Sequence, residues 1–200
     1  MPTYQAPVKD TLFVLNDVLG FERYSNLPGF ADSSGDMLEA ILGEAARVAE
    51  EVYQPTNRQG DLEGCHRNAD GSVTTPKSFK AAFDAYREGG WMGLAMPGEY
   101  GGQGLPYTVH QAAGEYFCSA NMALTMYSGL THGAIAAILV HGTDEQKSTF
   151  IPKMIEGTWT GTMNLTEPHC GTDLGLMRTK AVPDGKGAYK ISGQKIFISA

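Results

Sequence analysis

The chain has 200 residues, of which 42% are hydrophobic and 10% aromatic, and this composition excludes an intrinsically disordered protein. A formal net charge of -7 with scattered Lys and Arg leaves no basic face for a nucleic acid. The chain has three widely spaced cysteines, which predict a protein without disulfides. It has no signal-like apolar core near the start and no run of ~20 apolar residues, so we expect a cytoplasmic protein without a membrane span.

The first strong helical pattern begins at Asp36. Residues 1–35 predict a short helix or strand followed by a loop, and we interpret them as an N-terminal extension. Asp36 and Glu39 have the spacing of a capping box, and an apolar stripe follows at three- and four-residue steps. Pro55 is expected to end this helix, with a loop over residues 56–74.

A second helix is predicted to start at residue 76. Thr75 has the character of an N-cap, and Pro76 suits the first helical position. Gly89 and Gly90 are expected to stop the helix. The apolar segment 91–97 that follows is too short for another helix.

Three further helices are predicted before residue 157. The first covers residues 107–119, and the second covers residues 121–141. The second is apolar over much of its circumference, which predicts a central position. Thr143 and Gln146 form a capping-box pair that predicts a short helix ending before Pro152.

The pattern changes to β after residue 157. Residues 158–165 are rich in β-branched and aromatic side chains, while residues 189–192 and 195–199 alternate with period two. Asp184-Gly185 predicts a turn before them. Because the sequence stops within a predicted strand, we expect the chain to be truncated there.

The segment 165–175 has the greatest concentration of chemically useful side chains. It contains hydroxyls, glycines, acids, a histidine and a cysteine directly after a predicted strand. Gly171-Thr172 offers unhindered backbone N–H groups and a hydroxyl, which suit an anionic phosphate or a carbonyl group. Such a loop is equally compatible with a β-turn whose polar groups are satisfied within the protein.

Four ordered motifs resemble the acyl-CoA dehydrogenase family. Residues 165–174 resemble its Leu-Thr-Glu-Pro, Gly-Ser/Thr-Asp signature, and residues 97–102 its Pro-x-x-Tyr-Gly-Gly loop. Residues 142–147 resemble its Gly-x-x-Glu-Gln-Lys helix. Residues 193–199 resemble the strand that lies against the flavin in that family. The opening and the long loop over residues 57–75 resemble a longer subgroup that includes an enzyme of bacterial dimethylsulfoniopropionate breakdown.

The resemblance implies an α+β fold, in which an all-helical N-terminal domain precedes the start of a β-barrel-like middle domain. The implied divisions are the extension 1–35, the helical domain 36–157 and the start of the flavin-binding domain 158–200. The implied reaction is FAD-dependent α,β-dehydrogenation of an acyl-CoA thioester, with an electron-transfer flavoprotein as acceptor and a homodimer or homotetramer as the assembly. An acyl-CoA oxidase and a non-catalytic helical interaction module are the alternatives.

The resemblance also assigns site residues. Thr166 is expected near the flavin ring, Gly171 and Thr172 at the pyrophosphate, and Thr172 also at the acyl-CoA. Residues 163–175 and 195–199 are expected to form neighbouring β segments around the flavin ring and its diphosphate. The predicted FAD-binding residues are Met163, Leu165, Thr166, Gly171, Thr172, Phe197 and Ser199. No catalytic residue is predicted in this chain, because the family's carboxylate base is expected beyond residue 200, so the chain alone is expected to be inactive.

Several residues depart from the family pattern or suggest other chemistry. Met163 stands where the family often has an aromatic residue and Phe197 where it often has Trp, and both remain apolar. Glu167 is a carboxylate, but the resemblance makes it a structural member of the flavin loop and not the base. His169-Cys170 replace two small residues; because neighbours in an extended chain point to opposite faces, we expect a loop filler and no metal. His132 and His141 are interpreted as satisfied core residues of the long helix, and Met122 and Met126 as core.

Overall fold

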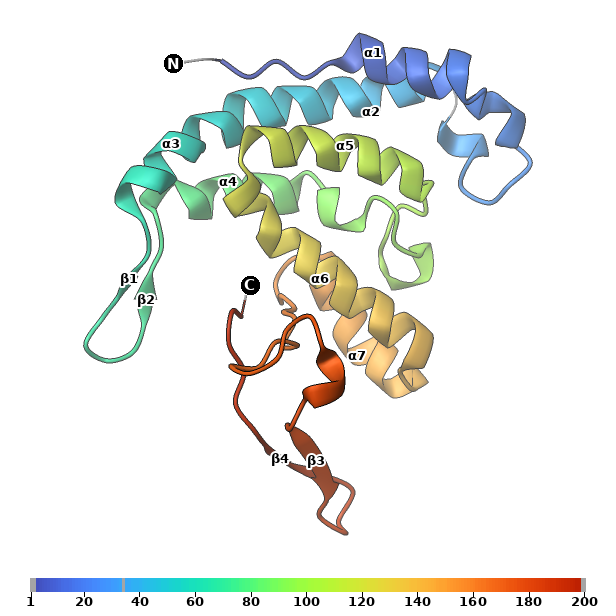
Figure 1. Ribbon diagram of the computed structural model, residues 1–200. Helices are drawn as coiled ribbons and strands as arrows, with labels where there is room; N and C mark the ends of the chain where they lie inside the picture. Colours follow the sequence, from blue (N-terminus) through green and yellow to red (C-terminus); the bar gives the residue numbers. More distant parts are fainter. Residues whose placement is uncertain (1–2, 34, 199–200) are drawn as a thin grey trace.

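The computed structural model describes residues 3–33 and 35–198, which are helical up to Ile155 and carry two short hairpins (Figure 1). The helices are α1 (Val8–Phe13), α2 (Gly35–Val48), α3 (Gln54–Glu63), α4 (Lys77–Glu88), α5 (Tyr107–Ala120), α6 (Met122–His141) and α7 (Asp144–Ile155). The strands are β1 (His66–Arg67), β2 (Val73–Thr74), β3 (Lys180–Pro183) and β4 (Tyr189–Ser192).

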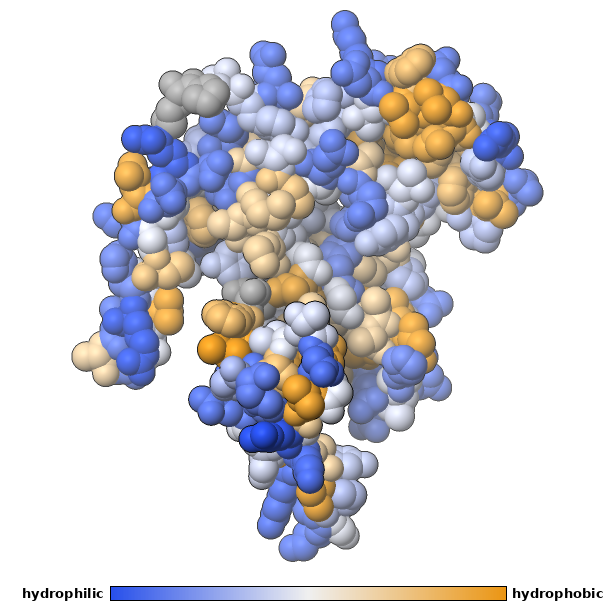
Figure 2. Space-filling view, viewed as in Figure 1, coloured by the Kyte–Doolittle hydropathy of each residue, from blue (hydrophilic) through white to orange (hydrophobic). Residues whose placement is uncertain are grey.

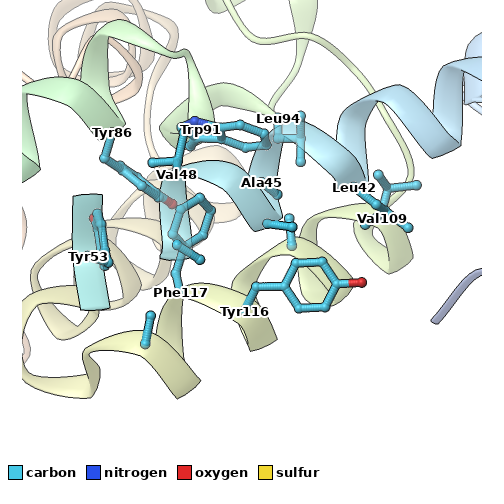
Figure 3. Close-up of a cluster of buried hydrophobic side chains, with 14 of the residues drawn as sticks. Leu42, Ala45, Val48, Tyr53, Tyr86, Trp91, Leu94, Val109, Tyr116 and Phe117 are labelled. Atoms are coloured by element: carbon cyan, nitrogen blue, oxygen red, sulfur yellow. The ribbon is translucent and has the colours of Figure 1, made fainter. Parts of the chain in front are cut away.

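The main core lies where α2, α4 and α5 meet (Figure 3). Phe117 of α5 is at its centre, with ring centroids 5.0 Å from Tyr53 and Tyr86 and 5.4 Å from Trp91. Each aromatic ring removes ~150–250 Å² from water, so this cluster is a major source of the domain's stability. The buried side chains of α2 that complete it are Leu38, Leu42, Ala45, Ala46 and Val48.

The N-terminal extension is helical and packs along α2 (Figure 1). α1 buries no residue of its own, and a π-helical turn, Val14–Val18, continues it. Leu15 and Phe21 reach the core, and the Ala6 N–H donates to Glu50 Oε1 of the helical domain (2.8 Å). The short helix expected here is therefore present.

The first long helix does not end at Pro55. The chain passes from α2 through a π-helical turn, Ala49–Tyr53, into α3, in which Pro55 is the second residue. The Gln54 N–H bonds the Ala49 carbonyl, five residues back, so the π-helical turn accommodates the missing N–H of Pro55. The predicted end is wrong for this reason. α2 also starts at Gly35, so Asp36 lies inside its first turn rather than before it.

The predicted loop over residues 56–74 is only partly a loop. Its first half is α3, and its second half is the β1–β2 hairpin, in which His66 lies opposite Thr74. The start of α4 is also different, because its N-cap is Pro76 and not Thr75. The first free N–H, that of Lys77, donates to Glu63 Oε2 at 2.9 Å, so the end of α3 caps the start of α4.

α7 begins with the predicted capping box, but it does not end before Pro152 as predicted. The Gln146 N–H donates to Thr143 Oγ1 (3.2 Å), and the Thr143 N–H donates to Gln146 Oε1 (2.9 Å), which is the capping box. The helix then continues through Pro152 to Ile155. One missing N–H is offset by three side chains that the last turn buries, namely Ile151, Met154 and Ile155.

α6 is less buried than its composition predicts. Asn121 caps it by accepting from the Leu124 N–H (3.1 Å), but Met122, Met126 and Val140 are exposed. The expectation that its methionines are core residues is therefore wrong. Among the described residues α6 is long and apolar enough to cross a membrane by length and composition, contrary to the expectation that no such run exists. It packs against α5 and α7.

The β part is sparser than predicted. β3 and β4 pair antiparallel, with Lys180 opposite Ser192, across the turn that Asp184-Gly185 predicts. Residues 158–165 form no strand and have a single β-bridge position, Met163, and the described residues of 195–199 form no strand either. Phe197 has a left-handed φ of 56°, which is incompatible with a continuous strand.

Candidate functional site

The chain makes a tight turn at Glu167–Cys170. The Glu167 N–H donates to the Cys170 carbonyl (2.8 Å), and the Cys170 N–H donates to the Glu167 carbonyl (3.1 Å). Proline favours such a turn at Pro168, because its ring fixes φ. The turn buries Glu167 (3% exposed) and Cys170 (7%) and leaves His169 on the surface.

The Glu167 carboxylate joins three segments of the chain. Oε2 accepts from the Arg178 N–H (2.8 Å), while Oε1 accepts from the Thr179 N–H (2.9 Å) and Lys195 Nζ (3.0 Å). The nearby Thr179 hydroxyl, the two N–H groups and the Lys195 ammonium all stabilise the charged form and hold the pKa of Glu167 well below its usual range. A carboxylate with so low a proton affinity is a poor general base.

The two segments predicted to face one another lie side by side. The Ile196 N–H donates to the Thr166 carbonyl (3.0 Å), and Lys195 Nζ donates to the Leu165 carbonyl (2.9 Å). Thr166 and Leu165 are therefore close to the segment that carries Phe197. Ser199, the last of the predicted site residues, lies outside the described residues.

The predicted site residues form an exposed surface with apolar and polar parts. Met163, Leu165 and Phe197 are 55%, 38% and 81% exposed, and Figure 2 shows hydrophobic side chains on the surface of the C-terminal part below the helices. Within the described residues, the N–H groups of Gly171 and Thr172 donate to no protein acceptor. Exposed apolar groups beside free backbone donors suit a ligand with a flat apolar part and an anionic part.

Gly171 has a steric role in this loop. A Cβ on Gly171 would lie 3.2 Å from Thr166 Cγ2, a tight contact that leaves little space beside the Thr166 side chain. The next turn is fixed by Asp173, whose Oδ1 accepts from the Gly175 N–H (3.1 Å). These contacts present the free N–H groups on a defined backbone.

The glycine motif at residues 97–102 is a packed loop, as the sequence predicts. Gly101 has a φ of 92°, and the Gly102 N–H donates to the Pro97 carbonyl (3.0 Å). A Cβ on Gly102 would lie 2.1 Å from the Met96 carbonyl oxygen, so only glycine fits there. The motif has a structural explanation without a ligand.

A cavity of about 720 Å³ lies in the helical domain, between α1, α5 and α6. Its wall contains a stacked pair of imidazoles, His110 of α5 and His132 of α6, with centroids 4.3 Å apart and ring planes at 20°. Both nitrogens of His132 are buried without a partner within the described residues, and His141 is exposed, so the expectation of two satisfied core histidines is wrong. Burial, reinforced by His110, lowers the pKa of His132 to about 4.

The sequence does not identify this cavity, because its two histidines lie on separate helices with no motif between them. The turn at Glu167–Cys170 also changes the expected arrangement of His169 and Cys170. The expectation that they point to opposite faces assumes an extended chain. The turn instead gathers them, so that ligand atoms of Glu167, His169 and Cys170 all lie within 4.8 Å of one another.

Comparison with known proteins identifies relatives that align with nearly the whole chain. The sequence model described as "Acyl-CoA dehydrogenase, N-terminal domain" matches residues 36–158. The chain is 42% identical to a 3-methylmercaptopropionyl-CoA dehydrogenase of Ruegeria pomeroyi, over 98% of this chain and 33% of the relative. It is 36% identical to a broad-specificity linear acyl-CoA dehydrogenase of Mycobacterium tuberculosis, over 100% of this chain and 33% of the relative. The chain thus spans about a third of the length of these relatives.

Solved structures resemble the fold. Butyryl-CoA dehydrogenase from Megasphaera elsdenii superposes with a TM-score of 0.69 at 26% identity, over 82% of this chain and 41% of that chain. A structure described as the electron transferring flavoprotein of Acidaminococcus fermentans gives 0.68 at 28% identity, over 82% and 40%. An acyl-CoA dehydrogenase from Bacillus anthracis complexed with FAD gives 0.68 at 23% identity, over 82% and 27%, which bears on the fold alone.

Proposed function

The chain belongs to the acyl-CoA dehydrogenase family, and from that premise we propose that the protein carrying it removes two hydrogens across the α,β bond of an acyl-CoA thioester, with FAD as cofactor. The observation that carries the proposal is the loop at residues 163–173. Its free Gly171 and Thr172 N–H groups lie next to the exposed apolar side chains of Met163 and Leu165. FAD, when bound, supplies the acceptor for the hydride.

Each part of the loop has a separate task in this proposal. The Gly171 and Thr172 N–H groups and the exposed Thr172 hydroxyl hold the anionic diphosphate, and Thr172 also faces the acyl-CoA. Leu165, Met163 and Phe197 cover the apolar ring system. Glu167 keeps these groups in register, because its carboxylate fixes the loop to Arg178, Thr179 and Lys195.

The carboxylate base is proposed to lie in a part of the relatives' length that this chain does not span. Glu167 is unsuited to that role, since its pKa is depressed and its oxygens already accept three hydrogen bonds. Residues 1–200 alone are therefore expected to be inactive. The proposed division is an extension 1–35, a helical domain 36–157 and the start of the flavin-binding domain 158–200.

The substrate we propose is 3-methylmercaptopropionyl-CoA, an intermediate of dimethylsulfoniopropionate breakdown, on the basis of the 42% identity to the Ruegeria pomeroyi enzyme. The proposed electron acceptor is an electron-transfer flavoprotein, which the Acidaminococcus fermentans comparison supports. The protein is proposed to work in the cytoplasm as a homodimer or homotetramer.

The test uses the full-length protein. It is expected to retain FAD, and 3-methylmercaptopropionyl-CoA should bleach the flavin absorption faster than butyryl-CoA. Reduction of an electron-transfer flavoprotein without peroxide release is the expected result, whereas peroxide release would identify an oxidase. A colourless protein that binds no FAD on titration would contradict the proposal and favour a non-catalytic module.

A pair of variants localises the cofactor contact. Thr172→Val removes the hydroxyl of the exposed turn and is expected to weaken FAD retention, because one polar contact is lost. Thr149→Val changes an exposed threonine of α7 in the same way and serves as the matched control. Equal FAD binding by both variants would remove Thr172 from the cofactor site.

A further inference from the structure

We propose that Glu167, His169 and Cys170 form a binding site for a divalent transition-metal ion of the Zn²⁺ type. A carboxylate oxygen, an imidazole nitrogen and a thiolate sulfur are the donors that Zn²⁺ takes in proteins, and three protein ligands with a water in the fourth position are a common arrangement. The site depends on the turn at residues 167–170 and not on the proposed function.

The distances fit a site that closes with small movements. The three ligand atoms lie within 4.8 Å of one another, and His169 Nε2 is 3.6 Å from Glu167 Oε2. Ligand atoms of a tetrahedral ion with bonds of ~2.0–2.3 Å lie roughly 3–4 Å apart, so shifts of about 1 Å complete the triangle. Cys170 is buried, and the surface position of His169 leaves a path for the ion.

The two oxygens of Glu167 face different neighbours. Oε1 faces Lys195, whose Nζ is 3.0 Å away and repels a cation, while Oε2 faces His169. The ion would therefore lie on the Oε2 side, where the Arg178 N–H (2.8 Å) already orients the oxygen.

The imidazole is already held by a partner outside the triad. His169 Nε2 is 3.0 Å from the Leu176 carbonyl oxygen. The same Nε2 is 3.6 Å from Glu167 Oε2, so it is the nitrogen that would bind the ion. Metal binding therefore requires Nε2 to give up its contact with the Leu176 carbonyl, and Nδ1 of the neutral ring then carries the hydrogen.

Binding requires no redox change. The Cys170 S–H bond breaks, its proton passes to solvent, and the sulfur bonds the ion, so one proton is released for each ion bound. The bound ion would crosslink the two ends of the Glu167–Cys170 turn. This turn directly precedes Gly171 and Thr172, so metal binding would stiffen that loop.

The experiment is a titration of the full-length protein with Co²⁺ and Zn²⁺. Co²⁺ should produce a thiolate-to-metal charge-transfer band that Zn²⁺ removes. Cys170→Ser should lose the band. His169→Ala should weaken Co²⁺ binding by about tenfold or more, and its surface position means that it does not threaten folding.

Matched controls separate this site from other thiols. Cys65 is exposed and adjacent to His66, and Cys118 is half-buried on α5. Cys65→Ser and Cys118→Ser should leave the band unchanged. The proposal is overturned if the wild-type protein gives no band, or if the band persists in Cys170→Ser and disappears in Cys65→Ser. Flavin binding does not enter either readout, so the two proposals fail independently.

Discussion

Glu167 connects segments that are otherwise held by few contacts, because β3 and β4 are exposed along their whole length. Its isosteric replacement is therefore informative. Glu167→Gln removes the ion pair with Lys195 and turns an amide NH₂ toward backbone donors. We expect a lower urea midpoint and faster proteolysis after residue 163.

Glu44→Gln is the control for this change. Glu44 also pairs with a basic side chain, Arg47, at 2.6 Å, but both partners are half-exposed on α2. Exposed pairs contribute ~0–1 kcal/mol, so this variant should hardly move the midpoint. Equal midpoints for Glu167→Gln and Glu44→Gln would show that Glu167 does not hold the segments together.

Alanine substitutions at Gly102 and Gly98 test whether the loop at residues 97–102 is as tightly packed as the structure indicates. Gly102→Ala places a Cβ 2.1 Å from the Met96 carbonyl oxygen, whereas a Cβ on Gly98 meets nothing within 4 Å. We expect Gly102→Ala to lower the free energy of unfolding by ~1–3 kcal/mol or more, and Gly98→Ala to change it by less than ~0.5 kcal/mol. Urea denaturation of both variants measures the difference, and a similar effect in each would contradict the packing.

His132 predicts a pH dependence of stability. Its pKa falls from 6.5 to about 4 on folding, so below pH 6.5 the unfolded chain binds a proton that the folded chain does not. The free energy of unfolding should therefore fall as the pH drops from about 6.5 to 4, by ~2–3 kcal/mol for this group. Burial lowers the pKa of His110 in the same direction.

The acids Asp10 and Glu115 also line the cavity, so variants are needed to isolate the histidine. Denaturation of His132→Gln between pH 4 and 7 should show a smaller loss of stability than the wild type. His141→Gln, at the exposed end of the same helix, is the control and should keep the wild-type slope. Parallel pH profiles for wild type and His132→Gln would exclude His132 as the source.

At the scale of an element, α7 depends on its capping box. Thr143→Ala removes the acceptor of the Gln146 N–H and leaves that donor free at the helix start. We expect a loss of ~1 kcal/mol in the free energy of unfolding. Ser148→Ala, in the middle of the same helix, removes a hydroxyl that bonds only the Glu145 carbonyl and should change stability by less than ~0.5 kcal/mol. Thermal melts of the two variants provide the comparison.

The elements that the sequence predicts well are those with local signals. The capping pair Thr143–Gln146 and the stop at Gly89-Gly90 depend on neighbouring residues only, and both are present. Pro55 and Pro152 were expected to end helices, yet both lie inside helical segments. In each case tertiary burial or a π-helical turn outweighed a single missing N–H, and neither factor is visible in a local pattern.

At the scale of the whole molecule, the family follows from the sequence, but much of the site's geometry does not. The neighbouring position of Thr166 and Ile196 was expected from the motifs, and their hydrogen bond agrees with it. The stacked His110 and His132 were not expected, because they meet only once α5 and α6 pack. The Glu167–Cys170 turn likewise reverses the chain where an extended strand was assumed.

The Glu63–Lys77 hydrogen bond fixes the neck of the β1–β2 hairpin, which projects from the helices (Figure 1). The helices on either side are joined across this neck directly, so they do not depend on the hairpin tip. Doubling the length of such a loop costs only ~0.6 kcal/mol in closure entropy. The tip around Asp70 and Gly71 is therefore a suitable position for inserting a reporter peptide or an affinity tag into this protein.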